Sequence, residues 1–235
     1  MVDVLFAAAS FPGAVVAPSA PPSRGIALAG LGVALFLIVG IWEIAGHAST
    51  MAHEGAHAAV FVLVGLGVRR VVIDYDDVRG HRGFTEPARP GVSVLAGMAG
   101  YYGPSLFGLL GAALLVNGSA TGVLWVYLVL LGLLLVVVRN LFGFFIVLLT
   151  GAILYLTVTY GSAMAQMIAA AAVVWLLLVV GVVLAFEHFW GGADYGILQE
   201  ATLFIPRIIW ALLAVAVSLS ALYFAGSWLL GYSQP

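Results

Sequence analysis

Residues 51–68 read MAHEGAHAAVFVLVGLGV, a run in which three ionisable side chains precede an almost purely apolar segment. The three are His53, Glu54 and His57, and they stand out because only 8% of the chain is charged. Placing an ionisable group in a membrane helix costs about 2.5–3.5 kcal/mol on insertion scales, so such groups mark functional sites by default. The stretch therefore predicts a membrane helix that carries a polar site.

The composition of the whole chain is that of a polytopic membrane protein. Of its 235 residues 64% are hydrophobic, well above the roughly 45–50% of soluble domains. The net charge is −2, and the eight arginines form no basic run, so nothing indicates a nucleic-acid partner. Cysteine is absent, which excludes disulfides and leaves the redox compartment open.

Apolar stretches of the length needed to cross a membrane, about 20 residues, occur seven times. The expected fold class is an all-α polytopic membrane protein with about seven transmembrane helices. For the break at GHAS (46–49), the alternative is a short span followed by a long kinked helix over 25–66. The predicted spans are 25–45, 48–67, 92–116, 121–138, 141–160, 164–186 and 207–230.

The arginines predict an orientation for these spans. With the N-terminus inside, all eight arginines fall on the inner side of the membrane, as the positive-inside rule requires. We expect one membrane-embedded domain over 25–235, preceded by a flexible or interfacial arm over 1–24. The arm does not read as a signal peptide, because it lacks an early positive charge and Pro12 interrupts its apolar run.

The one polar insertion covers residues 68–90, between the second and third predicted spans. Its β-branched residues and its glycines at 80 and 83 predict a small β-hairpin at the inner face. Its three aspartates (Asp74, Asp76, Asp77) suit a solvated tip better than a metal cluster, because their spacing does not match a calcium loop.

His53 and His57 are four residues apart in HEGAH, so on a helix their side chains share one face. Two imidazoles placed in this way can bind one zinc ion, and Glu54 beside them can take a proton from zinc-bound water. Zinc lowers the pKa of that water towards about 7 and polarises the scissile carbonyl. The alternative is a polar cluster between helices that holds no metal.

This pattern of HEGAH in a hydrophobic helix, a hairpin and a glycine-rich span resembles the site-2 protease class of intramembrane zinc metallopeptidases. The closest resemblance is to the compact actinobacterial-type branch without a PDZ domain, over residues 47–212. It implies an endopeptidase of the bacterial plasma membrane whose substrates are transmembrane segments of regulatory proteins, such as an anti-sigma factor. The segments that carry it are AHEGAHA (52–58), AGMAGYYGPSLFG (96–108), RNLFG (139–143) and GGADYGILQEATLFIPRIIW (191–210).

The third zinc ligand is not fixed by the HEGAH motif. The family's usual ligand aspartate lies in an Asn-Pro stretch that ends in Leu-Asp-Gly, but here no aspartate follows Asn140 within its span. Asp194 in GGADYG is the downstream candidate, and the resemblance also points to it; a loop carboxylate or a helix cap is the alternative. For Asp194 to reach His53, residues 187–206 must form a re-entrant segment, or the second span must begin near Trp42.

Other polar residues are weaker candidates. His47 lies seven residues before Glu54 on the same helix face, so it either supports the site or lines the outer helix end. For Asn140, the resemblance implies a hydrogen bond to a substrate backbone or to a ligand. Glu187 and His188 are rivals to Asp194, although His188 suits an interfacial aromatic belt better.

The function predicted is a zinc-dependent intramembrane endopeptidase, with a transmembrane protein substrate and membrane lipid as partners; the oligomeric state is not indicated. One alternative is a zinc-binding or metal-free scaffold of the same fold without proteolytic activity, which the missing Leu-Asp-Gly pattern favours. Another is a transporter built around intramembrane ionisable groups, against which the lack of a visible inverted repeat counts.

Overall fold

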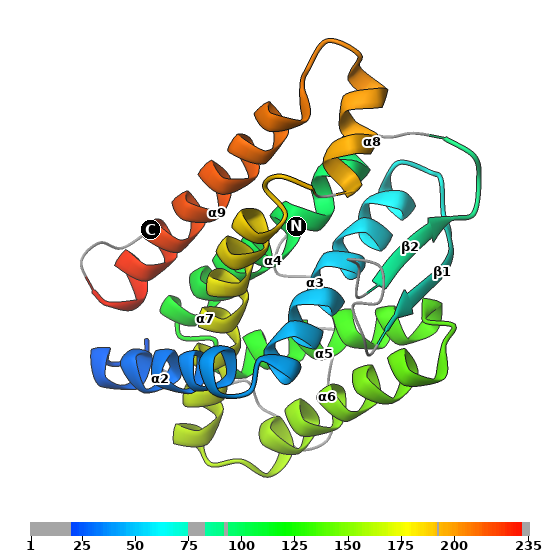
Figure 1. Cartoon of the computed structure of the whole chain (residues 1–235). Coiled ribbons are helices and arrows are strands. Elements are labelled where there is room, and N and C mark those ends of the chain that lie inside the picture. The colour runs from blue at the N-terminus through cyan, green and yellow to red at the C-terminus, as the bar shows by residue number, and fades with distance from the viewer. Residues whose placement is uncertain (1–19, 75–82, 92–93, 192, 232–235) are drawn as a thin grey trace, which may run out of the picture.

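The computed structural model describes residues 20–74, 83–91, 94–191 and 193–231, and this part of the chain is mostly helical (Figure 1). A two-stranded sheet, β1 (Val68–Ile73) and β2 (Gly83–Pro87), lies beside the helices. The helices are α2 (Arg24–Gly40), α3 (Trp42–Leu63), α4 (Val94–Val116), α5 (Ala120–Val137), α6 (Leu141–Tyr160), α7 (Ala163–Glu187), α8 (Ala193–Thr202) and α9 (Arg207–Leu229).

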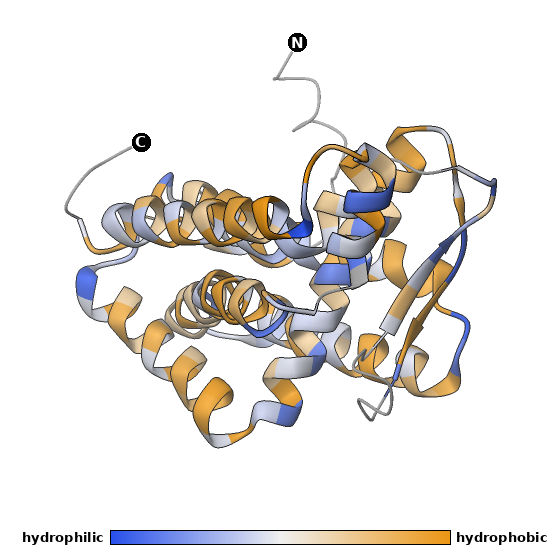
Figure 2. Ribbon diagram, turned by 45° about the horizontal axis from the view of Figure 1, so that its top comes forward, coloured by the Kyte–Doolittle hydropathy of each residue, from blue (hydrophilic) through white to orange (hydrophobic). Residues whose placement is uncertain are grey.

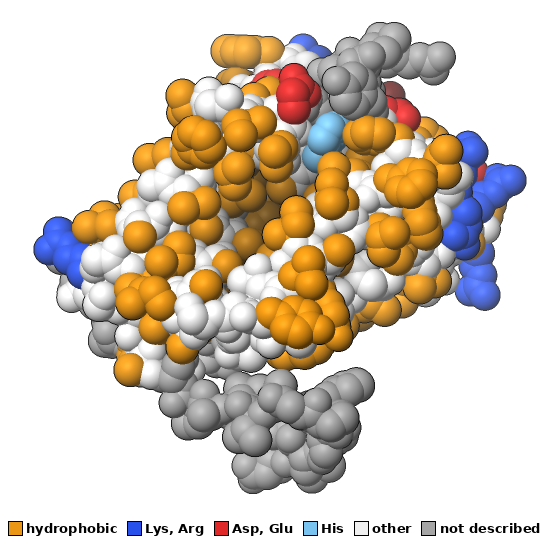
Figure 3. Space-filling model, turned by 90° about the horizontal axis from the view of Figure 1, so that it is seen from below, with side chains coloured by type: hydrophobic (Ala, Val, Ile, Leu, Met, Phe, Trp, Pro, Cys, Tyr) orange, Lys and Arg blue, Asp and Glu red, His pale blue; other side chains and the backbone are white. Residues whose placement is uncertain are grey.

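Five of the described helices are long and apolar enough to cross a membrane, namely α4, α5, α6, α7 and α9. The bent pair of α2 and α3 adds a sixth if it is counted as one span. Hydrophobic residues dominate the helices in Figure 2, and apolar side chains cover much of the face in Figure 3, with arginines at its margins. The chain is therefore an integral membrane protein, but the predicted seven spans are not confirmed.

The predicted helix break at 46–49 is wrong. Helix α3 runs from Trp42 to Leu63 without interruption, and the chain bends instead at Ile41, where α2 and α3 meet at 105°. The polar residues of the expected loop are inside the protein: His47 and Ser49 are buried, as is the next residue, Thr50. The Thr50 hydroxyl donates to a main-chain carbonyl one turn back, so it needs no water. A helix beginning at Trp42 is one of the two arrangements expected to bring His53 to Asp194.

This bend also affects the expected orientation. If α2 and α3 form one span, Arg24 and Arg69 lie on opposite sides of the membrane. With α2 and α3 counted as one span, the expectation that all eight arginines lie on one side is therefore not supported. The element order puts Arg69 in β1, Arg139 in the α5–α6 connection that joins β1, and Arg207 at the start of α9, after α7 has returned to the hairpin end of the bundle. The arm residues 1–19 lie outside the described residues.

Helix α4 lies at the centre of the bundle and contacts α3, α7, α8 and α9. Its glycines permit close approach of these neighbours. A Cβ on Gly103 would collide with Ala56 of α3, and one on Gly108 would press against Leu178 of α7. The helix continues through Pro104 as a single element. The small residues of α4 therefore let it pack directly against the helix that carries HEGAH.

The predicted β-hairpin is confirmed. Strands β1 and β2 are antiparallel, with Val71 opposite Thr85, and the expected acidic tip with Asp76 and Asp77 falls outside the described residues. The segment after α5 joins β1 through a parallel bridge from Val138 to Val71, and the Arg139 N–H donates to the Val71 carbonyl at 3.0 Å. The hairpin is thus attached to the α5–α6 connection.

Asn140 fastens the end of β1 to this connection. Its Nδ2 donates to the Ile73 carbonyl at 2.6 Å, and its Oδ1 accepts from the Ile73 N–H at 3.1 Å. We expect Asn140→Leu to reduce the local stability of the hairpin by about 1–3 kcal/mol, because two main-chain groups lose their partner. Hydrogen–deuterium exchange at Ile73 measures this loss as faster exchange.

The matched control for this variant is Asn117→Leu. The Asn117 side chain is exposed and donates only to a carbonyl one turn back in its own helix, so its loss should not change exchange in β1. Unchanged exchange at Ile73 in Asn140→Leu would show that the side chain does not hold the strand.

Candidate metal centre

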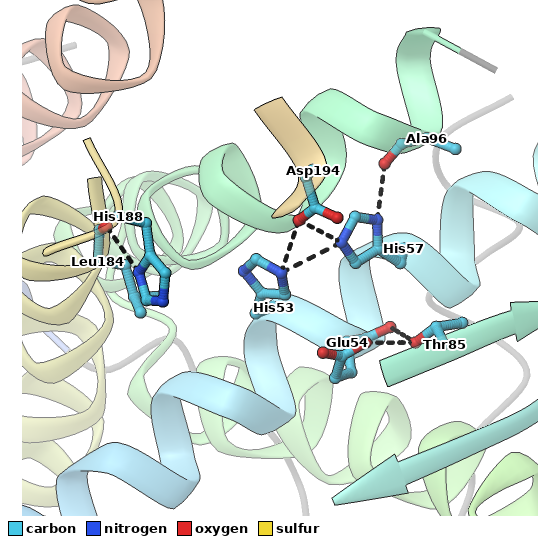
Figure 4. A network of polar contacts seen from close by, with 8 residues as sticks. All are labelled: His53, Glu54, His57, Thr85, Ala96, Leu184, His188 and Asp194. Carbon is cyan, nitrogen blue, oxygen red and sulfur yellow. Dashed lines mark hydrogen bonds and ion pairs between the residues drawn. The ribbon is translucent and has the colours of Figure 1, made fainter. Parts of the chain in front are cut away.

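Three potential metal ligands from two distant parts of the chain converge at α3 (Figure 4). The Nε2 atoms of His53 and His57 are 3.2 Å apart. The Oδ2 atom of Asp194, near the start of α8, lies 3.1 Å from each of them. The three atoms form a nearly equilateral triangle, so Asp194 does reach the two histidines of the HEGAH motif.

The dimensions and chemistry of this triangle fit a zinc ion. Ligands bound tetrahedrally at about 2.0–2.1 Å are about 3.3–3.4 Å from one another, close to the observed separations. Two imidazole nitrogens and one carboxylate oxygen form a ligand set that zinc accepts. His57 is oriented by its other nitrogen: Nδ1 donates to the Ala96 carbonyl at 2.7 Å, which leaves the Nε2 lone pair facing the centre.

Gly100 of α4 provides space beside the triangle. A Cβ built on Gly100 would collide with the Nε2 atoms of both His53 and His57. Every other residue type would therefore place an atom against the nitrogens that would hold the metal. The glycine keeps the centre open while allowing α4 to pack against α3.

Helix α8 brings Asp194 to the site. It packs on α4 through Tyr195 and Leu198, which are 2% and 1% exposed, and the Tyr195 ring stacks on Tyr101 at 4.2 Å. This packing places Oδ2 of Asp194 3.1 Å from the Nε2 atoms of both histidines. A metal would bind the deprotonated carboxylate together with neutral imidazoles.

Glu54 lies beside the triangle, on the side of α3 that faces the hairpin (Figure 4). The residue is 5% exposed, and its Oε2 accepts a hydrogen bond from the Thr85 hydroxyl at 2.7 Å. That hydroxyl is also 3.1 Å from the main-chain oxygen of Glu54. Sequence reasoning missed Thr85, because no motif marks a threonine on a hairpin as a neighbour of a helix residue.

The remaining candidates lie elsewhere. His47 is buried and meets the Phe142 ring edge-on at 5.0 Å, outside the group of three ligands. Asn140 holds the hairpin rather than the triangle. The His188 ring faces Tyr101 at 5.6 Å, and Nδ1 donates within its own helix, apart from the three ligands in Figure 4.

A helical membrane protein with HExxH on a buried helix, and an aspartate brought against its histidines, belongs by fold and site to the class of membrane-embedded metallopeptidases. The chain is a member of the peptidase M50B-like family, whose model matches residues 26–225. This is the site-2 protease family, so the resemblance seen in the sequence is confirmed. No match was found among the curated proteins or among the solved structures.

Proposed function

We propose that this protein is a zinc-dependent intramembrane endopeptidase. The observation that carries the proposal is the convergence of His53, His57 and Asp194 beside Glu54. The first three would hold zinc and leave a fourth position for water or substrate. Bound zinc would supply a Lewis acid for the scissile carbonyl and a lowered pKa for the attacking water.

In this proposal Glu54 is the general base. Its carboxylate takes the proton of the attacking water and then delivers it to the leaving amine. Ala96 holds the His57 ring in the orientation that presents Nε2, and His57 and Glu54 are both buried. Each of these groups acts from a membrane-embedded bundle, which fits a peptide bond that lies in a transmembrane segment.

The substrate class and the setting are part of the proposal. Family membership supports a transmembrane segment of a regulatory membrane protein as substrate. Arginines at the hairpin end support a cytoplasmic location for that end, in a bacterial plasma membrane.

Two of these arginines also form ion pairs within the hairpin. Arg69 and Arg70 both bind Glu86, at 2.7 and 2.6 Å, and the hydrogen bond from Arg70 lowers the Glu86 pKa.

Metal analysis of the purified protein and of Asp194→Ala tests the metal site. We expect one zinc per chain in the wild type and at least a hundredfold weaker binding in Asp194→Ala, because one of three protein ligands is lost. Glu200→Ala is the control, since it removes an exposed carboxylate from the same helix. Cleavage of a synthetic transmembrane substrate should be lost with the zinc.

Two outcomes would contradict the proposal. Wild-type protein that binds no zinc when prepared without chelators would exclude a metallopeptidase. Wild-type protein that holds one zinc but cleaves no transmembrane substrate would instead indicate an inactive scaffold of the same fold.

A further inference from the structure

The carboxylate of Glu54 is held from the hairpin rather than from its own helix (Figure 4). Strand β2 reaches α3 so closely that a Cβ on Gly83 would stand 3.0 Å from Thr50 and 3.3 Å from the Cγ of Glu54. Two residues later, Thr85 projects its hydroxyl to the Glu54 carboxylate. The glycine and the threonine thus place β2 directly on the face of α3 that carries Glu54.

This hydrogen bond uses one carboxylate oxygen and leaves the other available. A hydroxyl has a single proton, and the Thr85 hydroxyl directs it to Oε2 over a short distance of 2.7 Å. The Oε1 atom then remains as the one that can accept a proton from water. A general base works only if its accepting atom is held within hydrogen-bond reach of that proton.

We infer that Thr85 is a positioning residue, which holds the Glu54 carboxylate from β2 so that Oε1 receives the proton of the attacking water. The inference rests on the proposed function. Thr85 touches neither the metal ligands nor the reacting atoms, so it acts through Glu54. Asn140 and Val138 attach β1 to the α5–α6 connection and so hold the hairpin in place. The position of the Glu54 carboxylate therefore depends on the packing of the hairpin against α3.

Kinetics of Thr85→Val and Thr85→Ser test the effect on catalysis. Valine matches the shape of threonine but lacks the hydroxyl, so kcat should fall about ten- to a hundredfold, the worth of a hydrogen bond to a charged group. KM should stay within about twofold and zinc at one per chain, while Thr85→Ser should restore most of kcat. Thr150→Val is the control, because that hydroxyl bonds only its own α6 backbone.

Hydrogen–deuterium exchange in zinc-free protein tests the contact without any cleavage. Thr85→Val and Glu54→Ala should each speed exchange of the β2 amides, and the double variant should exchange no faster than either, because both changes remove the same interaction. Thr150→Val should leave β2 exchange as in the wild type.

The two measurements separate this inference from the proposed function. If the effects of Thr85→Val and Glu54→Ala on β2 exchange were additive, or if neither variant changed it, the inference would be overturned whatever the activity. A wild-type kcat in Thr85→Val would also overturn it. Suppose instead that the double variant exchanges no faster than either single variant, but the wild-type protein cleaves no substrate. That result would overturn the proposed function and still support Thr85 as the residue that holds Glu54.

Discussion

Glu54→Gln is expected to lower the rate of transmembrane-segment cleavage by about 10²–10⁴-fold while zinc stays at one per chain. Glutamine keeps the shape of glutamate, and its carbonyl oxygen can still accept from the Thr85 hydroxyl at the position seen here. It cannot take up a proton from water at neutral pH, so the step assigned to the base is lost. The three ligand atoms lie on other residues and are not altered.

Single-turnover cleavage, with zinc analysis of the same preparation, measures both parts of this expectation. Glu200→Gln makes the same chemical change on an exposed face of α8 and should retain wild-type rates. If Glu54→Gln kept more than a tenth of the wild-type rate, Glu54 would not be the general base. If it lost its zinc, Glu54 would serve the metal rather than the proton.

The sequence predicted the local half of the site well because a helix turn fixes it. His53, Glu54 and His57 lie within five residues, so their relation follows from helix geometry alone. Asp194 lies 137 residues beyond His57 and was indicated mainly by the lack of other suitable acidic residues. Thr85 depends on the docking of β2 against α3, and no periodicity in the chain encodes that contact.

The same distinction applies to the fold. The predicted spans 92–116 and 141–160 match α4 (Val94–Val116) and α6 (Leu141–Tyr160) closely, because length and hydropathy are enough to define an isolated membrane helix. The region 25–67 was divided wrongly because polar residues were assigned to a loop in water. His47 and Ser49 are buried, and burial depends on packing partners that the sequence of one segment does not show.

Gly100→Ala is expected to weaken zinc binding by more than the roughly 10–100-fold typical of changes around metal ligands, and to abolish cleavage. One methyl group has this effect because the new Cβ would collide with the Nε2 atoms of both His53 and His57. The substitution itself favours the helix, since alanine is about 1 kcal/mol better than glycine in a helix interior. A loss of zinc would therefore not come from a lower helix propensity of α4.

Zinc affinity and thermal unfolding of the zinc-free forms separate the two effects. Gly55→Ala is the matched control, because a Cβ at Gly55, inside the HEGAH motif itself, meets nothing within 4 Å. We expect it to bind zinc as the wild type does. Wild-type zinc affinity in Gly100→Ala would mean that α4 does not approach the two histidines so closely. Weak binding with an unchanged melting temperature of the zinc-free protein would show that an open volume beside His53 and His57, as well as the three ligands, makes this a metal site.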